Sequence, residues 1–298
     1  MDLRRKIRKE YLGRAVVTLF GFFIILLTLS IGAFLFYKGM ATFTVHKHSI
    51  LEFLFSSKWS PAQIGQGGSV GAAIFIFGSI TISLLALLIA TPFSLAAALF
   101  LTEISPHLGR KLLQPAVEIF VGIPSVVYGW VGLTVLVPAI AKLFHLPYGY
   151  SVLAGAIVLA VMIFPTITSV SSDAIRNVAE EYKEASYGLG STRWQLIRHV
   201  IVPAALPGIL TGVVLGLARA FGEALAVAMV IGKMQAFPGN ILKPTVNLTS
   251  EITADMGNTI SGSEWNDALW TMALFLLVIS FIFIVLIRIV GRMGENKK

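Results

Sequence analysis

Six blocks of apolar residues, each long enough to cross a bilayer as a helix, constrain this chain more than any other feature. The blocks cover residues 13–37, 70–101, 112–141, 149–171, 203–232 and 266–290. A helix needs about 20 apolar residues to cross ~30 Å of hydrocarbon. Only 13% of the residues are charged and the mean hydropathy is +0.83, whereas charged residues make up about 25% of ordinary soluble domains. We therefore expect an all-α integral membrane protein with about six transmembrane helices.

Two blocks are longer than one span requires, and they contain Pro92 in one case and Pro124 and Pro138 in the other. Tilt, a kink and partial re-entry all accommodate such lengths, so the sequence leaves the three open. The first block is too long for the apolar region of a cleavable signal, and no Ala-x-Ala pattern follows Tyr37. We interpret it as a retained helix.

Lys and Arg residues are distributed unequally between the two sides of the predicted membrane. Of the 23, sixteen lie on the side of the N-terminus and six on the other, and Arg219 lies within a span. Cytoplasmic segments carry the excess of Lys and Arg, so both termini and residues 173–202 are predicted to be cytoplasmic. This topology explains the pI of about 9.8 without nucleic-acid binding. The chain has no cysteine, which excludes disulfides, thiol chemistry and cysteine-based metal sites.

Residues 173–202 are a polar segment between two spans. Apolar side chains recur at three- and four-residue spacing in its first half, which predicts a short amphipathic helix over residues 173–187. The residues of its apolar face are Ala174, Val178, Tyr182 and Ala185. Gly188 and Gly190 are predicted to end that helix, since glycine tolerates the positive φ of a helix end.

A second short helix is expected to follow the glycines. Thr192, with Gln195 three residues later, is typical of a capping box and predicts a helix as far as His199. Pro203 and Pro207 are tolerated in a first helical turn, so a new membrane helix is predicted to begin there. Helix, glycine turn and helix together form a knob suited to a cleft in a partner protein.

Arg219 and Glu223 lie in the fifth apolar block. A charged residue at mid-bilayer costs about 2.5–3.5 kcal/mol, so it normally faces a polar partner or a watery path. Four-residue spacing predicts that the two share one helix face, where they either neutralise each other or line a path for an anion. Small residues in the same block form a ladder at four-residue spacing that favours close helix packing. They are Gly208, Gly212, Gly216 and Ala220.

Glu118 in the third block is a further candidate for the path, and a position at the membrane interface explains it equally well. His46 and His48 alternate in an outer segment. We interpret them as two exposed loop residues rather than a metal site. We expect the outer segments, residues 38–69 and 233–265, to be solvated loops with some short helix that serve as a docking surface.

The pattern Glu184-Ala185-Ser186, with Gly190 six residues after Glu184 and with Val200-x-Val202-Pro203, resembles the signature loop of permease subunits of bacterial ABC importers. Ser186, Val200 and Val202 depart conservatively from the usual Ala, Ile and Leu. In these importers the loop is a coupling helix that docks on the ATP-hydrolysing subunit. The resemblance implies the coupling role for Glu184, Ala185, Ser186, Gly190 and Pro203.

The resemblance extends over nearly the whole chain and is strongest to the PstC family, permease subunits of the bacterial phosphate ABC importer. The segments that carry it are Phe-Leu-Thr-Glu at 100–103, Ala-Val-Glu-Ile-Phe-Val-Gly-Ile-Pro-Ser-Val-Val-Tyr-Gly at 116–129, the loop at 184–190, and Leu-Gly-Leu-Ala-Arg-Ala-Phe-Gly-Glu-Ala at 215–224. It implies a MetI-like permease arrangement, in one domain over residues 1–298, with an N-terminal helix at 13–37, a core at 70–290 and a coupling loop at 173–202.

The family also implies partners and a location. These are a PstA-like second permease subunit, a PstB-like ATP-binding subunit dimer and a PstS-like external phosphate-binding protein, in the bacterial inner membrane. The chain has no Gly-x4-Gly-Lys-Ser/Thr loop, so ATP is expected to be hydrolysed by the partner and no cofactor is expected here. A permease for molybdate or sulfate, a PstA-type subunit and, more remotely, a membrane-embedded enzyme remain as alternatives.

Overall fold

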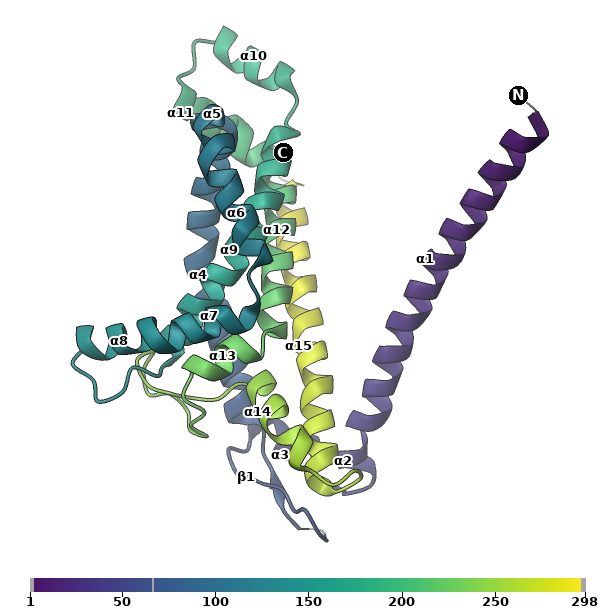
Figure 1. Cartoon of the computed structure of the whole chain (residues 1–298), viewed down its shortest axis with the longest axis vertical. Helices are drawn as coiled ribbons and strands as arrows, with labels where there is room; N and C mark the ends of the chain where they lie inside the picture. Colours follow the sequence, from purple (N-terminus) through teal and green to yellow (C-terminus); the bar gives the residue numbers. More distant parts are fainter. Residues whose placement is uncertain (1–2, 66, 296–298) are drawn as a thin grey trace.

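The computed structural model describes residues 3–65 and 67–295, with side chains over 13–65 and 67–289. Within these ranges the regular elements are helices apart from one two-stranded hairpin, and irregular segments connect them (Figure 1). Six helical segments are long and apolar enough to cross a membrane, which confirms the predicted fold class. They are Gly13–Thr44, Ala73–Ile104, Ser125–Leu143, Val152–Arg176, Arg193–Gly222 and Glu264–Ile289.

Four long helices form the bundle: α4 (Ala73–Leu99), α9 (Val152–Arg176), α12 (Val202–Gly222) and α15 (Glu264–Glu295). Helix α9 packs against both α4 and α12 and is the most deeply buried of the candidate spans. Its buried side chains interlock with those of α4 and α12 in one apolar core. In a membrane, such packing and not water exclusion holds helices together.

The small-residue ladder of α12 faces α9. A Cβ on Gly212 would lie 3.2 Å from Val170 Cβ, and one on Gly216 would lie 2.7 Å from Ile167 Cγ1. Larger side chains would therefore force the two backbones apart. The close approach predicted from the four-residue spacing is confirmed.

The third apolar block is not one span. Helix α6 (Gln114–Gly122) runs along the bundle, and Ile123 and Pro124 are extended, with ψ of 128° and 142°. The chain then turns across the bundle as α7 (Ser125–Val131), the π-helical η3 (Gly132–Leu136) and α8 (Val137–Leu143) (Figure 1). The residue before a proline avoids helical geometry, which explains the break. Of the possibilities that the sequence left open for this block, the structure shows a break at Ile123 and Pro124.

The fifth block is also interrupted. Helix α12 ends at Gly222, Glu223 is extended with ψ of 123°, and the short α13 (Leu225–Val230) follows. A single span over 203–232 is therefore wrong. The segments beyond the two breaks pack tightly together, since a Cβ on Gly129 of α7 would lie 2.9 Å from Ala226 Cα of α13.

Several short elements lie at the end of the bundle where α15 begins. They are α2 (Ala41–Thr44), α3 (Ile50–Phe55), the hairpin of β1 (Trp59–Ser60) with β2 (Ser69–Val70), α14 (Leu248–Asp255) and the 3-10 turn η5 (Met256–Asn258). Residues 245–251 are buried and pack against α4, where the Leu248 N–H donates to Ser79 Oγ at 2.9 Å. The expectation of a solvated loop is wrong for this stretch, because its backbone enters the bundle.

His46 and His48 are not exposed loop residues, which corrects the sequence-based interpretation. Their rings lie 3.0 Å from Asp267 and 2.9 Å from Glu264, at the start of α15. The His46 and Glu264 side chains are only 7% and 0% exposed. The two pairs therefore tie the segment after α1 to α15.

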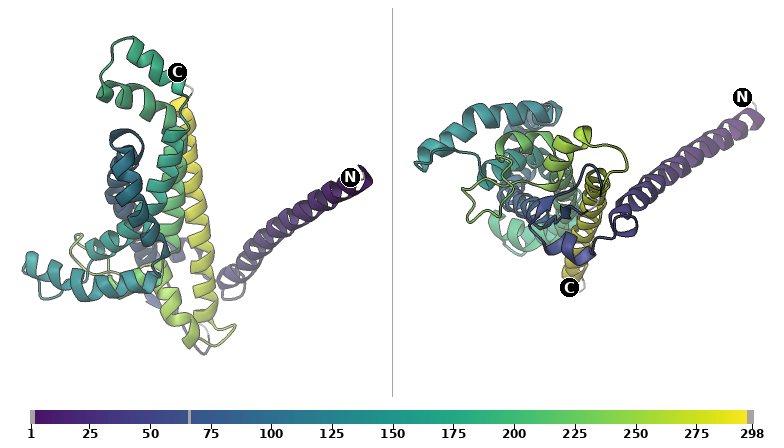
Figure 2. Two further views of the ribbon diagram at one scale, coloured as in Figure 1. Left: turned by 45° about the horizontal axis from the view of Figure 1, so that its top comes forward. Right: turned by 90° about the horizontal axis from the view of Figure 1, so that it is seen from below.

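Helix α1 (Leu3–Gly39) projects away from the bundle (Figure 2). Its side chains from 13 to 31 are exposed, and it meets α15 near its end, where Phe34 packs edge-on against Trp270. An apolar helix without a protein partner along most of its length is suited to contact with lipid or with another membrane helix.

We expect Gly78→Ala to destabilise the chain, because its Cβ would overlap the carbonyl oxygen of Val246, a backbone atom that cannot rotate away. Overpacking of this kind costs about 1–3 kcal/mol. Thermal unfolding in detergent should show a lower midpoint. Gly21→Ala is the matched control, since it lies in a long helix with nothing within 4 Å, and its midpoint should not fall. An unchanged midpoint for Gly78→Ala would contradict the close contact.

Candidate functional site

Arg219 lies in the last turn of α12, beside the break that follows it. Its side chain is half-buried, and Nη1 donates to the Thr166 hydroxyl of α9 at 3.2 Å. The C-terminal end of a helix carries partial negative charge, which stabilises a cation there. Arg219 is thus held by a neutral hydroxyl and by a helix end.

Glu223 does not pair with Arg219, and the predicted shared helix face is wrong. The helix ends between them, so four-residue spacing no longer places them together. Glu223 Oε1 instead accepts the Ala226 N–H at 3.1 Å and caps α13. Among the described side chains, the ion pairs do not include Arg219. Neutralisation within this pair is therefore not how the chain accommodates Arg219.

Side chains satisfy the backbone groups that the two breaks release. The Tyr128 hydroxyl donates to the Phe120 carbonyl at 2.7 Å across the first break. The Thr249 hydroxyl of α14 donates to the Glu223 carbonyl at 2.9 Å at the second. Unpaired backbone groups cost several kcal/mol in hydrocarbon, so these bonds allow irregular backbone inside the bundle. Half-helix ends of this kind form solute sites in membrane transporters.

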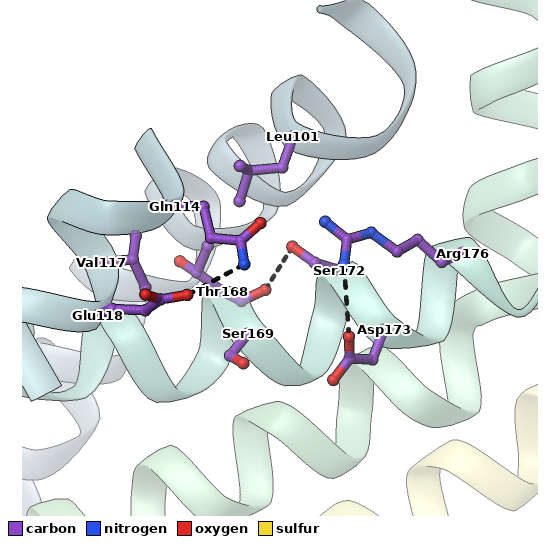
Figure 3. A pocket seen from close by; sticks show the side chains of 9 residues that line it. All are labelled: Leu101, Gln114, Val117, Glu118, Thr168, Ser169, Ser172, Asp173 and Arg176. Atoms are coloured by element: carbon purple, nitrogen blue, oxygen red, sulfur yellow. Dashed lines mark hydrogen bonds and ion pairs between the residues drawn. The ribbon is translucent and has the colours of Figure 1, made fainter. Parts of the chain in front are cut away.

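Glu118 is exposed on α6 and accepts a hydrogen bond from Gln114 Nε2 at 3.0 Å. It lines a polar pocket of about 90 Å³ between α6, α9 and the π-helical continuation of α4 (Figure 3). Arg219 is not among the residues that line this pocket. The pocket lining is Leu101, Gln114, Val117, Glu118, Thr168, Ser169, Ser172, Asp173 and Arg176. The three residues predicted to line the path thus lie in two places, with Arg219 and Glu223 at the break after α12 and Glu118 in this pocket.

The hydroxyl residues of α9 were missed by the sequence reasoning. Thr166 holds Arg219, and Thr168, Ser169 and Ser172 line the pocket with Glu118. The sequence does contain a signal for them, because a run of hydroxyl side chains inside an apolar span is unusual. No single motif marks their role, which depends on which helices α9 touches.

The polar segment after α9 differs from its predicted form. Helix α9 continues to Arg176, so residues 173–176 do not belong to the following helix, α10 (Glu180–Gly188). No residue of α10 is buried, and Tyr182 and Ala185 of the predicted apolar face are exposed. Its other two members, Ala174 and Val178, precede α10 and pack in an apolar cluster of the bundle. Gly190 has a φ of +79°, which confirms the predicted glycine turn.

The second half of that segment confirms the capping box. Thr192 and Gln195 cap each other at the start of α11 (Arg193–Leu196). The expected end at His199 is wrong, because the helix runs through the π-helical η4 (Ile197–Ile201) directly into α12. Pro203 has no N–H to complete an α-helical turn, and the wider turn of η4 immediately before it accommodates this loss.

Helices α10 and α11 are attached to η1 (Phe100–Ile104), the π-helical turn that continues α4. Lys183 Nζ lies 3.2 Å from Glu103, and Arg193 Nη2 donates to the Ile104 carbonyl at 2.9 Å. Burial alone lowers the pKa of Lys183, but the hydrogen bond and charge of Glu103 outweigh it, and the pKa lies above its usual value. Lys183 is therefore a persistent cation that connects α10 with the bundle.

This segment exposes three large side chains that are apolar or aromatic. Tyr182, Leu189 and Trp194 are 59%, 90% and 63% exposed. Glu184 and Ala185 are exposed beside them, Ser186 is half-buried and hydrogen-bonds to Ser191 at 2.6 Å, and Gly190 forms the turn. Large aromatic and aliphatic side chains exposed together mark a protein-interaction surface. We call this surface the α10–α11 knob.

Glu251 on α14 is a buried carboxyl outside the membrane-spanning segments. Burial, followed by the charge of Asp255, raises its pKa from 4.5 to about 7. Gln235 Nε2 donates to it at 2.8 Å. Within the described residues, no group of three or more His, Cys, Asp and Glu side chains is arranged to hold a metal ion.

Residues 90–293 match the family described as binding-protein-dependent transport system inner membrane component, and the chain belongs to this family. It is therefore a multi-pass permease component of a transport system. The probable ABC transporter permease protein YqgH of Bacillus subtilis is 51% identical, over 94% of this chain and 90% of that protein. The phosphate transport system permease protein PstC of Pasteurella multocida is 33% identical, over 97% and 93%.

Solved structures confirm the permease fold. A bacterial alginate ABC transporter, in complex with a periplasmic protein bound to alginate pentasaccharide, contains a chain similar to this one. The TM-score is 0.63 at 18% identity, over 98% of this chain and 97% of that chain. A chain of the inward-facing MetNI methionine ABC transporter gives a TM-score of 0.54 at 19% identity, over 75% and 94%.

Replacement of Glu251 by Gln tests the buried carboxyl. Because its pKa is raised on folding, the native state binds a proton that the unfolded state has released, and stability falls as pH rises from about 4.5 through 7. Glu251→Gln should remove this dependence, which is at most about 1.4 kcal/mol per pH unit. We compare the unfolding midpoint of the variant with that of wild type, in detergent, at each pH. The variant's midpoint minus the wild-type midpoint should be larger at pH 8 than at pH 5.

Glu181→Gln, at an exposed carboxylate of α10, is the control and should change nothing between the two pH values. The same midpoint difference at both pH values for Glu251→Gln would contradict the assignment.

Proposed function

We propose that this chain is a permease subunit of an ATP-driven phosphate importer. The observation that carries the proposal is the state of Arg219, a half-buried guanidinium at a helix break that is held by a hydroxyl instead of a carboxylate. Its charge remains available to a passing anion, and its planar fork donates two hydrogen bonds to an oxyanion. The PstC relatives support phosphate as that anion.

Glu223 contributes to the proposed path by shaping the backbone. Its carboxylate accepts the Ala226 N–H at the start of α13. This bond stabilises the non-helical backbone that follows Arg219. Glu118 contributes at a separate point, in the polar pocket beside α9. Molybdate and sulfate importers, and a PstA-type role, remain the alternatives, since an arginine alone attracts any oxyanion.

The α10–α11 knob is the proposed contact with a PstB-like ATPase dimer, which hydrolyses ATP. Glu184, Ala185, Ser186 and Gly190 lie in it, and Pro203 follows where α11 runs into α12. The remaining proposed partners are a PstA-like second permease subunit and a PstS-like phosphate-binding protein at the opposite face. Membrane lipid surrounds the exposed apolar helices.

The distribution of basic residues supports the orientation that we propose. Lys183 and Arg193 lie in the α10–α11 knob. Arg110 and Lys111 lie in the π-helical η2 (Gly109–Leu113), which packs against η1, the segment to which the knob is attached. Cytoplasmic ends of membrane proteins hold the excess of Lys and Arg. We therefore assign the end of the bundle that carries the knob, together with both termini, to the cytoplasmic side of the bacterial inner membrane.

Arg219 variants test the substrate. Uptake of radiolabelled phosphate by cells that depend on this importer should fall about 10–100-fold in Arg219→Leu, the value of a charge-assisted hydrogen bond. Arg219→Lys should also be impaired, because an ammonium lacks the planar fork. Arg14→Leu, on the exposed part of α1, is the control for loss of a charge and should transport normally. Wild-type uptake by a normally inserted Arg219→Leu protein would refute the anion role.

Two glycines in the knob test the coupling. Gly190→Val should weaken co-purification of the ATPase subunit several-fold, because a branched side chain is strained at a φ of +79° and distorts the turn. Gly188→Ala is the matched control, because nothing lies within 4 Å of that position and its φ is not positive. Equal recovery of the ATPase with both variants would argue against docking through this turn.

A further inference from the structure

The polar pocket beside α9 has both the room and the unused hydrogen-bonding groups of a binding site. Its volume of about 90 Å³ is several times the ~10–15 Å³ that one water requires. Thr168 lines it and is fully buried, and its hydroxyl has no hydrogen-bond partner among the described residues. A buried hydroxyl without a partner is costly, so it points to a bound polar group.

Donors and acceptors are present together in this pocket (Figure 3). The available donors are the Arg176 guanidinium, the second N–H of the Gln114 amide, and the hydroxyls of Thr168 and Ser169. The Ser172 hydroxyl already donates to the Thr168 carbonyl at 2.8 Å. The acceptors are the carboxylates of Glu118 and Asp173. Arg176 lies 4.0 Å from Asp173, and both side chains are largely exposed, so this pair is weak and opens easily. Both groups are thus available to a ligand.

A fully deprotonated oxyanion does not fit this set, because its oxygens only accept and two carboxylates would repel it. A cation does not fit well either, because Arg176 belongs to the same lining. A protonated oxyanion matches both the donors and the acceptors. Its P–OH donates to a carboxylate, and its charged oxygens accept from Arg176 and the hydroxyls. Phosphate keeps at least one proton at neutral pH, whereas sulfate keeps none.

The pocket is connected to Arg219 along one face of α9. Thr166 binds Arg219, and Ser169, Asp173 and Arg176 follow at spacings of three, four and three residues. Such spacing places the four on one side of a helix. Thr166 and Arg176 are ten residues apart, which is about 15 Å along the axis. A polar track therefore leads from the break towards the cytoplasmic end.

We propose that this pocket is a second substrate site, at the cytoplasmic end of the path, which accepts a protonated oxyanion and rejects sulfate. The inference rests on the proposed transport of phosphate. It adds that the pocket, which lies beyond Arg219 on the path, is where phosphate is selected over sulfate. Glu118 and Asp173 recognise the proton of the ligand, and Arg176 and Thr168 hold its charged oxygens. The site thereby favours phosphate over the sulfate alternative that an arginine alone leaves open.

The test is binding of radiolabelled inorganic phosphate to the full chain in phosphatidylcholine nanodiscs. It is carried out in an Arg219→Leu background, so that the pocket is measured alone. We expect saturable binding at pH 7 that a tenfold excess of sulfate does not displace. Glu118→Gln with Asp173→Asn should weaken phosphate binding at least tenfold and allow sulfate to compete, because the acceptors become donors.

Ser169→Ala should weaken binding several-fold, whereas the matched control Ser171→Ala, a buried hydroxyl of the same helix outside the pocket, should not. Where the carboxylate variants unfold, this serine pair decides the question. Equal binding by all variants, displacement by sulfate from the unaltered pocket, or displacement by Mg²⁺ would overturn the proposal. Binding that is blocked when phosphatidic acid is added to the nanodisc, and that free phosphate cannot restore, would assign the pocket to a lipid headgroup instead.

Failure of this inference is distinguishable from failure of the transport proposal. Cells that import no phosphate through the wild-type protein, while the nanodisc pocket still binds it selectively, would refute only the transported substrate. Normal phosphate uptake with no selective binding in the pocket would refute only the second site.

Discussion

The need to satisfy backbone groups inside a membrane determines how this chain can build a site. Two helices are interrupted within the bundle, and each interruption leaves carbonyl and N–H groups without helical partners. Tyr128 and Thr249 donate to the released carbonyls, and the Glu223 carboxylate accepts from the N–H of Ala226. Without such partners the irregular backbone would be too costly in hydrocarbon. The site at Arg219 depends on these bonds.

The breaks also change the electrostatics of the bundle. A helix end near Arg219 stabilises its charge, so a carboxylate is not needed for that purpose. Thr166 orients the guanidinium without neutralising it. The other hydroxyl side chains of α9 likewise supply polar contacts without adding charge. A low density of fixed charge suits the anion path that we propose, since an anion bound too tightly would not leave.

The α10–α11 knob is joined to the same machinery by short connections. Lys183 and Arg193 attach it to η1, which continues α4, and η4 joins α11 to α12 without a loop. Helix α12 carries Arg219 at its other end. A displacement of the knob by a partner would thus act on α4 and α12 directly. Transmission along rigid helices requires no flexible linker between the knob and the break.

Local patterns allowed much of this to be predicted. The capping box at Thr192, the turn at Gly190 and the close packing of α12 through Gly212 and Gly216 depend on residues near each other in sequence. The pairing of Arg219 with Glu223 failed because it assumed a continuous helix. The exposure of His46 and His48 was wrong because their carboxylate partners lie more than 200 residues away.

The sequence by itself determined that the chain is a helical membrane protein, because apolar length and the requirement for internal hydrogen bonds admit few other structures. It also determined which charges are unusual and where the polar segment lies. Only the tertiary structure decided which groups meet, since Thr166 with Arg219 and Glu118 with Thr168 belong to different helices. Contacts between helices depend on where each helix breaks and which face it turns inward, and no local pattern in the chain encodes both.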